Sequence, residues 1–424
     1  MDRFTADSAT AAKDAILNVS HINLLSDAVK DTVEINAVAP AITLGENDTL
    51  ASHIATSVKE VAYSPIYKYG GGYDPTTGNF TFSRGSSKDY NNVNPSIMVS
   101  PVAAQLGGYM GMIDTYNNAF SNMDMRMLLP STVRVAQKNA NKYAITDTKG
   151  ADFTTNETNS DGTWVRPFAA YDSVGLKNGP KVHKMSYGSF IGGDTAVHQF
   201  ANGAEGVLSA HVSSLGSHQS FAGNSIYQNG GNIGLTGTLY KGNFFSGLSL
   251  NTGASVADAS TMYGNEDFPM FMAGIANKTG YNIEFKEGKF IIQPSLLLSY
   301  TFVNTFNYTN ASGVKIDGDP LHALQISPNV RFALNTKNGW QPYLTAGMNW
   351  NIMNSSEFMA NAAELPSLSV KPYVQYGCGL QKTVNDNFTA YAQVLLRNGG
   401  RNGIAANAGM KYLFGHESRL KENI

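Results

Sequence analysis

The stretch Ile291–Phe302, IIQPSLLLSYTF, alternates apolar and polar residues along most of its length. One parity carries Ile292, Pro294, Leu296, Leu298, Tyr300 and Phe302, and the other carries Gln293, Ser295, Ser299 and Thr301. Because successive side chains of a β-strand point to opposite faces, this period of two predicts a strand with one apolar and one polar face.

The same alternation recurs throughout the C-terminal part of the chain, between turns rich in Gly, Asn and Asp. In the next segment, the apolar parity carries Leu324, Ile326, Val330 and Phe332, and the polar parity carries Gln325, Ser327, Asn329 and Arg331. In the one after, the apolar parity carries Pro342, Leu344, Ala346, Met348, Trp350 and Ile352, and the polar parity carries Gln341, Thr345, Asn349 and Asn351. We predict strands at 163–174, 182–193, 206–219, 226–240, 244–258, 267–284, 292–302, 324–332, 342–352, 369–382, 388–397 and 403–414. An even number of antiparallel strands closes a barrel with both of its ends on one side.

Strand length favours a membrane-spanning barrel over a soluble β-sandwich. Segments of about 10 to 15 residues exceed the usual five or six of soluble strands and match the 9 to 11 that cross a bilayer at a tilt. Short turns such as YKGN, FKEGK and VNDN alternate with the longer YTNASGVKIDGD and NSSEFMANAAELPS, as expected for a barrel with two unlike rims. Aromatic residues at strand ends suit interfacial girdles: Phe244, Phe268, Phe290, Tyr300, Phe388 and Phe414.

The composition agrees with an outward apolar and an inward polar surface. Charged residues are 15% of the 424-residue chain, against about 25% in an average soluble domain. The net charge of -2 gives no reason to expect a nucleic-acid partner. No run reaches the roughly 18 to 20 apolar residues of a transmembrane helix, whereas barrel strands escape such a scan. The single cysteine, Cys378, forms no disulfide within the chain, and no Cys/His spacing predicts a metal or cofactor site.

Ahead of the barrel, the sequence predicts two further units and a linker. Residues 1–93 contain short β-type runs such as VEINAVAPAITL, which we interpret as rungs of a β-solenoid, the alternative being a disordered leader. Within 94–130, a helix is predicted over about 99–127, with Ser100 as N-cap before Pro101. Its apolar stripe contains Val102, Leu106, Tyr109, Ile113, Tyr116, Phe120, Met123 and Met127. A polar linker at 131–162 follows, then the barrel at 163–414 and a tail at 415–424.

The segment 388–414, FTAYAQVLLRNGGRNGIAANAGMKYLF, resembles the last two strands of the autotransporter β-domain of type V secretion systems. Asn407, Gly409, Tyr412 and Phe414 match the terminal pattern by which outer-membrane barrels are recognised for assembly. The likeness extends to WVRPFAAY, SYGSFIGGD and SVKPYVQYGCGLQK in the barrel and to SPIYKYGGGYDPTTGNFTF ahead of it. In one departure, the chain continues beyond Phe414, where the family usually ends.

The resemblance implies a barrel folded into the outer membrane by the barrel assembly machinery, with its own passenger exported to the cell surface. The helix would thread and plug the lumen. Its apolar stripe does not suit a polar lumen, so it would seal against the passenger rungs or against lumen glycines and aromatics. The polar parity predicts lumen-facing side chains at Arg331, Gln375, Gln393, Arg397 and Lys411, with Arg166, Lys184 and Lys371 as further candidates and few acids.

Chemistry beyond transport has little support in the sequence. No Ser/His/Asp set, paired carboxylates or phosphate loop stands out, so we expect no catalytic residues and no enzyme. His183, His211, His218 and His322 are interpreted as solvated strand or loop histidines. Asn117-Asn118 resembles the pair at which some autotransporters sever their passenger by asparagine cyclisation; the alternative is an ordinary polar helix face.

Two other functions stay open at this stage. The barrel could be only the anchor of a surface adhesin or structural coat, in which the passenger does the binding. Alternatively, the chain could be a soluble fibre-like β-protein. The opening Met1-Asp-Arg-Phe lacks the basic and apolar regions of a signal peptide, so an exported protein would be a piece of a longer one.

Overall fold

The computed structural model describes residues 99–131 and 161–413, apart from 337–338, 354, 362 and 386–387. Before residue 99 it describes short pieces only: 17–18, 22–23, 32–35, 54–55, 61–64, 66–74, 79–83 and 93–94. The predicted linker and the tail, Phe414 included, lie outside the described residues.

Twelve antiparallel strands form a closed barrel, as the alternating sequence predicts. Each strand pairs with the next along the chain, and the last pairs with the first, so the sheet has no free edge there. The strands are β8 (Gly162–Gly175), β9 (Lys181–Asp194), β11 (Glu205–Phe221), β12 (Asn224–Lys241), β13 (Phe244–Thr261), β14 (Gly264–Tyr281), β16 (Phe290–Thr305), β19 (Leu321–Leu334), β20 (Trp340–Met353), β23 (Tyr373–Asn385), β24 (Phe388–Gly399) and β25 (Arg401–Leu413).

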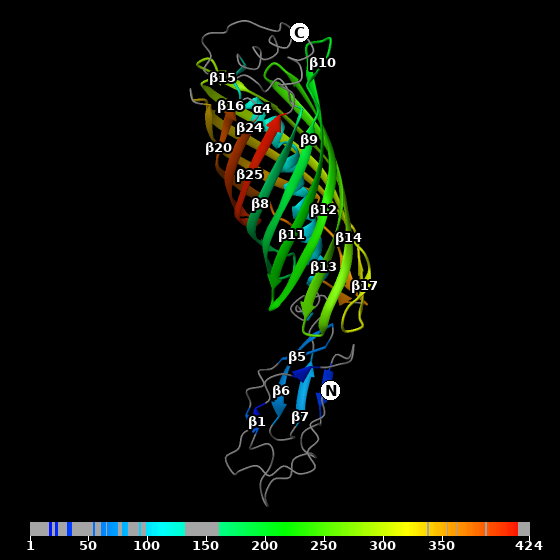
Figure 1. Ribbon diagram of the computed structural model, residues 1–424. Coiled ribbons are helices and arrows are strands. Elements are labelled where there is room, and N and C mark those ends of the chain that lie inside the picture. Colours follow the sequence, from blue (N-terminus) through cyan, green and yellow to red (C-terminus); the bar gives the residue numbers. More distant parts are fainter. Residues whose placement is uncertain are drawn as a thin grey trace, which may run out of the picture.

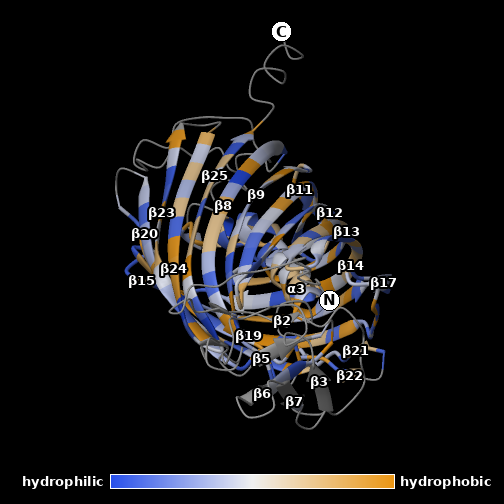
Figure 2. Cartoon of the chain, turned by 90° about the horizontal axis from the view of Figure 1, so that it is seen from below, coloured by the Kyte–Doolittle hydropathy of each residue, from blue (hydrophilic) through white to orange (hydrophobic). Residues whose placement is uncertain are grey.

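The apolar face of the strands points outward and the polar face inward. Leu296 and Val394 are 40% and 43% exposed, while Gln293 and Arg397 on the opposite parity are 2% and 4% exposed. Figure 2 shows this alternation as orange and blue patches along the strands. In water an outward apolar surface of this extent would be unfavourable, which argues against the soluble fibre-like alternative.

The connections differ between the two rims of the barrel. The N-terminal sheets lie beyond one rim, and the beginning of β8 and the end of β25 lie at the other (Figure 1). The long connections 306–320 and 354–372 are at the rim nearer the N-terminal sheets, where β17 (Tyr308–Thr309), β18 (Lys315–Gly318), β21 (Phe358–Ala360) and β22 (Ala363–Glu364) form a small sheet. Turns 222–223 and 262–263 at the same rim are short, so the predicted alternation of loop lengths holds only in part. Short strands β10 (His198–Gln199) and β15 (Ile283–Phe285) extend the wall at the far rim.

A helical rod occupies the lumen. It consists of α3 (Ser100–Ala119) and α4 (Ser121–Met127), which meet at Phe120. The whole predicted apolar stripe is buried, with Tyr116 at 0% and Phe120 at 1% exposure. The described residues contain no helix with the length and hydropathy needed to cross a bilayer.

One detail of the helix and one of the barrel wall differ from the sequence prediction. Val99, and not Ser100, is the N-cap, because the Val99 carbonyl accepts the first intrahelical hydrogen bond, from the Ala103 N–H at 2.9 Å; no side chain caps the helix. Phe268, predicted for an interfacial girdle, is fully buried because even-numbered residues in this part of β14 face inward. There its ring stacks on that of Tyr308, with 4.4 Å between the centroids.

The N-terminal strands form a two-stranded parallel sheet and a five-stranded mixed sheet. β1 (Leu17–Asn18) pairs with β4 (Ile54–Ala55), and β2 (Ile22–Asn23) with β5 (Val61–Tyr63), both parallel as stacked solenoid rungs require. By contrast, β5, β6 (Lys68–Asp74), β7 (Asn79–Ser83) and β3 (Thr32–Ile35) pair antiparallel. The solenoid interpretation of residues 1–93 therefore stays a prediction.

Candidate functional site

Glycines on the helix allow it to lie close to the barrel wall. A Cβ added to Gly107 would lie 2.0 Å from Oε1 of Gln228 on β12, and one added to Gly108 would lie 3.1 Å from Met272 and from Val303. Both distances are shorter than ordinary Cβ contacts, so a larger side chain at either position would have to displace Gln228, Met272 or Val303. The glycines of α3 therefore let the rod lie directly against side chains of the wall.

Glycines on the barrel wall accept the aromatic residues of the helix. The Tyr116 hydroxyl occupies the space over Gly274, donates to the backbone oxygen of Tyr300 at 3.1 Å and lies 3.1 Å from Thr301 Oγ1. The Phe120 ring packs in the same way over Gly247. At the other end of the helix, the same apolar cluster includes Tyr67 and Tyr69 of the N-terminal region. The helix thus packs against lumen glycines, one of the two surfaces that the sequence suggested, while the assignment of Tyr67 and Tyr69 to passenger rungs stays a prediction.

The first charged contact joins α4 to two cations of the wall. Asp124, whose side chain is 4% exposed, lies 2.5 Å from Lys278 Nζ and 3.1 Å from an Arg331 guanidinium nitrogen. Arg331 also lies over the ring of Tyr343, 5.2 Å from its centroid. A carboxylate this deeply buried requires ionic partners, so Asp124 has a defined place only where both cations reach it.

The second charged contact lies at the seam where the barrel closes. Asp172 on β8 accepts hydrogen bonds from Arg397 on β24, at 3.0 Å, and from Arg401 on β25, at 2.7 Å. Asp114 of α3 lies 3.8 Å and 4.0 Å from the same two guanidinium groups. Asp172 is 0% exposed, so the contacts lie inside the lumen. Together they join the first strand, the last two strands and the helix.

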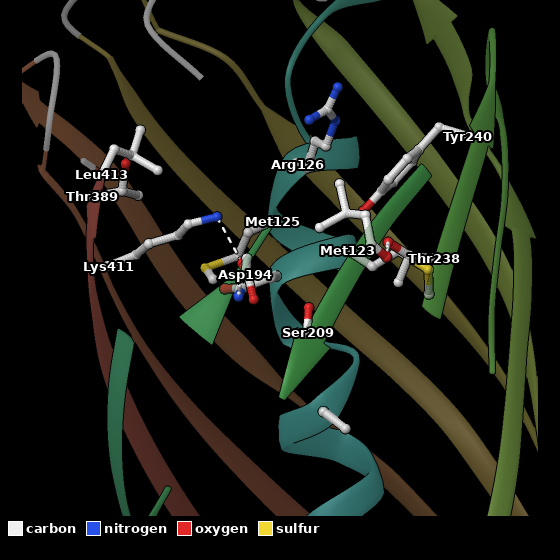
Figure 3. Close-up of a pocket in the computed structure, with 13 residues that line it drawn as sticks. Met123, Met125, Arg126, Asp194, Ser209, Thr238, Tyr240, Thr389, Lys411 and Leu413 are labelled. Atoms are coloured by element: carbon white, nitrogen blue, oxygen red, sulfur yellow. Dashed lines mark hydrogen bonds and ion pairs between the residues drawn. The ribbon is translucent and has the colours of Figure 1, made fainter. Parts of the chain in front are cut away.

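A third polar cluster surrounds the end of the helix at the far rim (Figure 3). Lys411 contacts Asp194 at 2.9 Å, and Asn122 of α4 donates to the same carboxylate at 2.6 Å. Arg126 forms an ion pair with Glu205 at 2.7 Å. The cavity between these groups measures only about 40 Å³, and a second one beside the helix glycines about 30 Å³. Voids of this size hold a few water molecules at most.

The predicted lumen-facing residues lie mainly in these clusters. Arg331, Arg397 and Lys411 form the ion pairs described above, and Gln375 accepts a hydrogen bond from Arg397 Nε at 3.0 Å. Gln393 is half-buried on the inward parity of β24. Of the further candidates, Arg166 and Lys184 are 1% and 2% exposed, on inward positions of β8 and β9. Lys371 is a correction: it is exposed, because it precedes β23, which begins at 373 and not at 369.

Two other sequence expectations about the lumen were wrong. Acids are well represented there, with Asp114 and Asp124 on the helix and Asp172 and Asp194 on the wall. Asp172 could have been found from the sequence, because it shares the parity of Arg166 on one strand. His211 is a lumen residue at 4% exposure, whereas the sequence suggested a solvated histidine.

The remaining predicted positions lie on β25 and α3. Asn407 is half-buried, Gly409 lies beneath the Tyr391 ring, and Tyr412 faces outward at 52% exposure. Of the asparagine pair, Asn117 is exposed and Asn118 is 3% exposed. The backbone carbonyl of Asn118 accepts a hydrogen bond from the Arg166 guanidinium, and the Asn118 side-chain amide donates to the Asp114 carbonyl at 2.8 Å.

Among the described residues, no group of three or more His, Cys, Asp or Glu side chains could hold a metal ion. The clusters instead pair charges of opposite sign across the rod and the wall. Fold and lumen together define a class: transmembrane β-barrels of the outer membrane that hold a helix of their own chain in the pore.

Comparison with known proteins gives the family within this class. The family model of the autotransporter β-domain matches residues 163–394, more than half of the chain, and the protein belongs to this family. It therefore carries an outer-membrane translocator domain, and its place is the outer membrane. No curated protein sequence matches the chain.

Solved structures of translocator domains are similar in fold. The transport unit of the autotransporter AIDA-I from Escherichia coli aligns with a TM-score of 0.53 and 16% identity, over 66% of this chain and 97% of that one. The β-domain of the Bordetella autotransporter BrkA has 15% identity over 60% and 100%, with a TM-score of 0.49. The translocator domain of NalP from Neisseria meningitidis has 11% identity over 71% and 98%, also with a TM-score of 0.49. Identities this low concern the fold alone.

Proposed function

We propose that this barrel exports the N-terminal part of its own chain to the cell surface and retains the helix as a plug. The observation that carries the proposal is the helix itself, which fills the lumen and joins the N-terminal sheets beyond one rim to the barrel strands that begin at the other (Figure 1). A chain that passed outward through the pore would end in this arrangement. The N-terminal sheets would then be the end of the passenger.

The two helix carboxylates explain why the chain would stop at this position. Asp114 and Asp124 are ten residues apart, which corresponds to about 15 Å along a helix. Both meet cation pairs on the wall, Arg397 with Arg401 and Lys278 with Arg331. A shift of one turn would move each carboxylate about 5 Å from its partners and leave buried charges unpaired. The clusters thus favour a single axial position.

The partners that follow from this function are the outer-membrane lipid, the barrel assembly machinery and the passenger. Outward apolar residues on the strands fit the lipid. Asn407, Gly409, Tyr412 and Phe414 are the proposed signal to the assembly machinery, on the last strand and directly after it. No step of this function requires a catalytic group, a metal or a cofactor.

An export assay separates this function from that of a passive anchor. Gly274→Trp places an indole where the chain passes, because a Cβ there already meets Tyr116. Gly237→Trp is the matched control, since Gly237 lies on the outward parity of β12 with open space around it. Both variants would be expressed behind a secretion signal, and protease would be added to intact cells.

We expect both barrels to assemble, as judged by heat-modifiable migration on a gel. The N-terminal region should be cleaved from outside in the Gly237→Trp control and be protected in Gly274→Trp. Equal cleavage in both assembled variants would refute export through the lumen and favour the anchor of an adhesin or coat.

Passenger release at Asn117-Asn118 is a separate proposal. Cyclisation of Asn117 would break the bond to Asn118 and create a new N-terminus there. Sequencing of the mature N-terminus on cells tests it, with Asn117→Ala as the control. An uncut wild-type chain would leave the pair as polar residues that position the helix through Arg166.

A further inference from the structure

The outer surface of the barrel has an apolar groove that crosses β11, β12, β13, β14 and β16. Its volume is about 730 Å³, which lies within the range of small-molecule sites. The floor is made of small outward residues, Thr252 and Ala273, with the backbone of Gly234 and Gly274. β11 to β14 lie side by side in Figure 1, and β16 pairs with β14.

Two rows of paired residues explain the hollow. One row, Ala210, Leu235, Leu250, Ile275 and Tyr300, consists of direct cross-strand partners and forms one wall. The neighbouring row, Val212, Ile233, Thr252, Ala273 and Phe302, is small in its middle and large at its ends. The Thr252 hydroxyl donates to the Met272 carbonyl at 3.1 Å, and the buried residues His211 and Asn251 also line the hollow. Most of the lining residues are apolar.

A polar pair lies where the groove meets β19. The Tyr300 hydroxyl and Nδ1 of His322 are 2.7 Å apart, and both side chains are exposed on the outer surface. The His322 ring also packs edge-on against Phe302, with centroids 5.3 Å apart. A phenol and an imidazole can both donate hydrogen bonds to a phosphate. An occupant of the groove would therefore have an apolar chain and an anionic end.

We propose that this groove is a specific site for one acyl chain of a phosphate-bearing outer-membrane lipid, with the phosphate at Tyr300 and His322. The barrel lies in the outer membrane, so lipid surrounds this face, and both the mainly apolar lining and the polar end fit such a molecule. On the lumen side of the same place in the wall, the Tyr116 hydroxyl of the helix lies over Gly274. The inference does not depend on export of the passenger.

Native mass spectrometry of the full chain in detergent, titrated with dipalmitoylphosphatidylglycerol, tests the site. We expect the wild type to retain one lipid under activation that strips the others. Ala273→Trp fills the floor and should lower that retention at least tenfold. Ala169→Trp, an outward alanine on β8 away from the groove, should behave as the wild type. His322→Ala should remove the preference for phosphatidylglycerol over the phosphate-free dipalmitoylglycerol.

Retention in Ala273→Trp equal to that of the wild type would overturn the proposal, as would a wild-type dimer that excludes lipid. Heat-modifiable migration checks that each variant is assembled. If Ala273→Trp fails to assemble, the smaller Ala273→Leu serves in its place, with a severalfold loss expected. Because lipid retention is measured without the passenger assay, failure of this site and failure of export are distinguishable.

Discussion

Replacing Asp124 by Asn removes one negative charge from the lumen at nearly constant shape. In the native chain this carboxylate is the ionic partner of both Lys278 and Arg331. The amide cannot balance the two cations, and their side chains, each 14% exposed, stay largely inside the wall. The substitution therefore affects the contact between plug and wall and leaves the β-ladder unchanged.

The size of the effect follows from the burial of the pair. Removing one partner of a buried ion pair costs about 3 to 5 kcal/mol, and the partial exposure of the cations favours the lower end of that range. About 3 kcal/mol corresponds to roughly a hundredfold change in an equilibrium, at about 1.4 kcal/mol per factor of ten. We expect the population of barrels with an undocked helix to rise by that factor.

Single-channel recording of the full chain in planar bilayers measures this population as the fraction of time spent in a high-conductance state. Asp317→Asn is the matched control, because its ion pair with Lys315 is exposed, at 41% and 65%. An exposed pair contributes about 0 to 1 kcal/mol, so this variant should open hardly more often than the wild type. Equal opening of the two variants would show that Asp124 does not hold the helix.

Three further substitutions test other contacts. Gly108→Leu would have to displace Met272 on β14 and Val303 on β16 and should raise conductance, whereas Gly111→Ala, with its nearest neighbour 3.5 Å from the added Cβ, should not; a closed Gly108→Leu channel would contradict the packing argument. Tyr116→Phe loses one hydrogen bond to β16, about 1 kcal/mol, and should raise opening only severalfold in the same recordings. Arg401→Gln leaves the buried Asp172 with one guanidinium, a loss of about 3 kcal/mol or more, and should lower the temperature at which the barrel loses compact migration on a gel; an unchanged temperature would exclude a role in closure.

Much of the barrel could be predicted because each strand lies between two environments, lipid outside and a polar lumen inside. That difference imposes a period of two, which places Leu296 outward and Gln293 inward directly from the sequence. The helix was equally visible as an apolar stripe. Prediction failed at Phe268, which faces inward with the even-numbered residues of this part of β14 and stacks on Tyr308 of a connection distant in the sequence.

The charged clusters of the lumen were harder to predict than its lining. Parity alone indicates that Arg397 faces inward, but its partner Asp172 lies on the first strand, and only closure of the barrel brings them together. Asp124 likewise meets Lys278 and Arg331 only once the rod is inside. The outer groove depends on five strands in register, because its small residues are far apart in the sequence and aligned in space.

The position of Asp172 has a consequence for how the polypeptide becomes a cylinder. The strand that carries this acid is the first of the wall to be synthesised, and its two arginines arrive with the last two strands. A chain cut short before β24 would keep an open β-edge together with a desolvated negative charge that nothing neutralises. Both features destabilise such a fragment, so the seam disfavours the insertion of truncated chains into the bilayer.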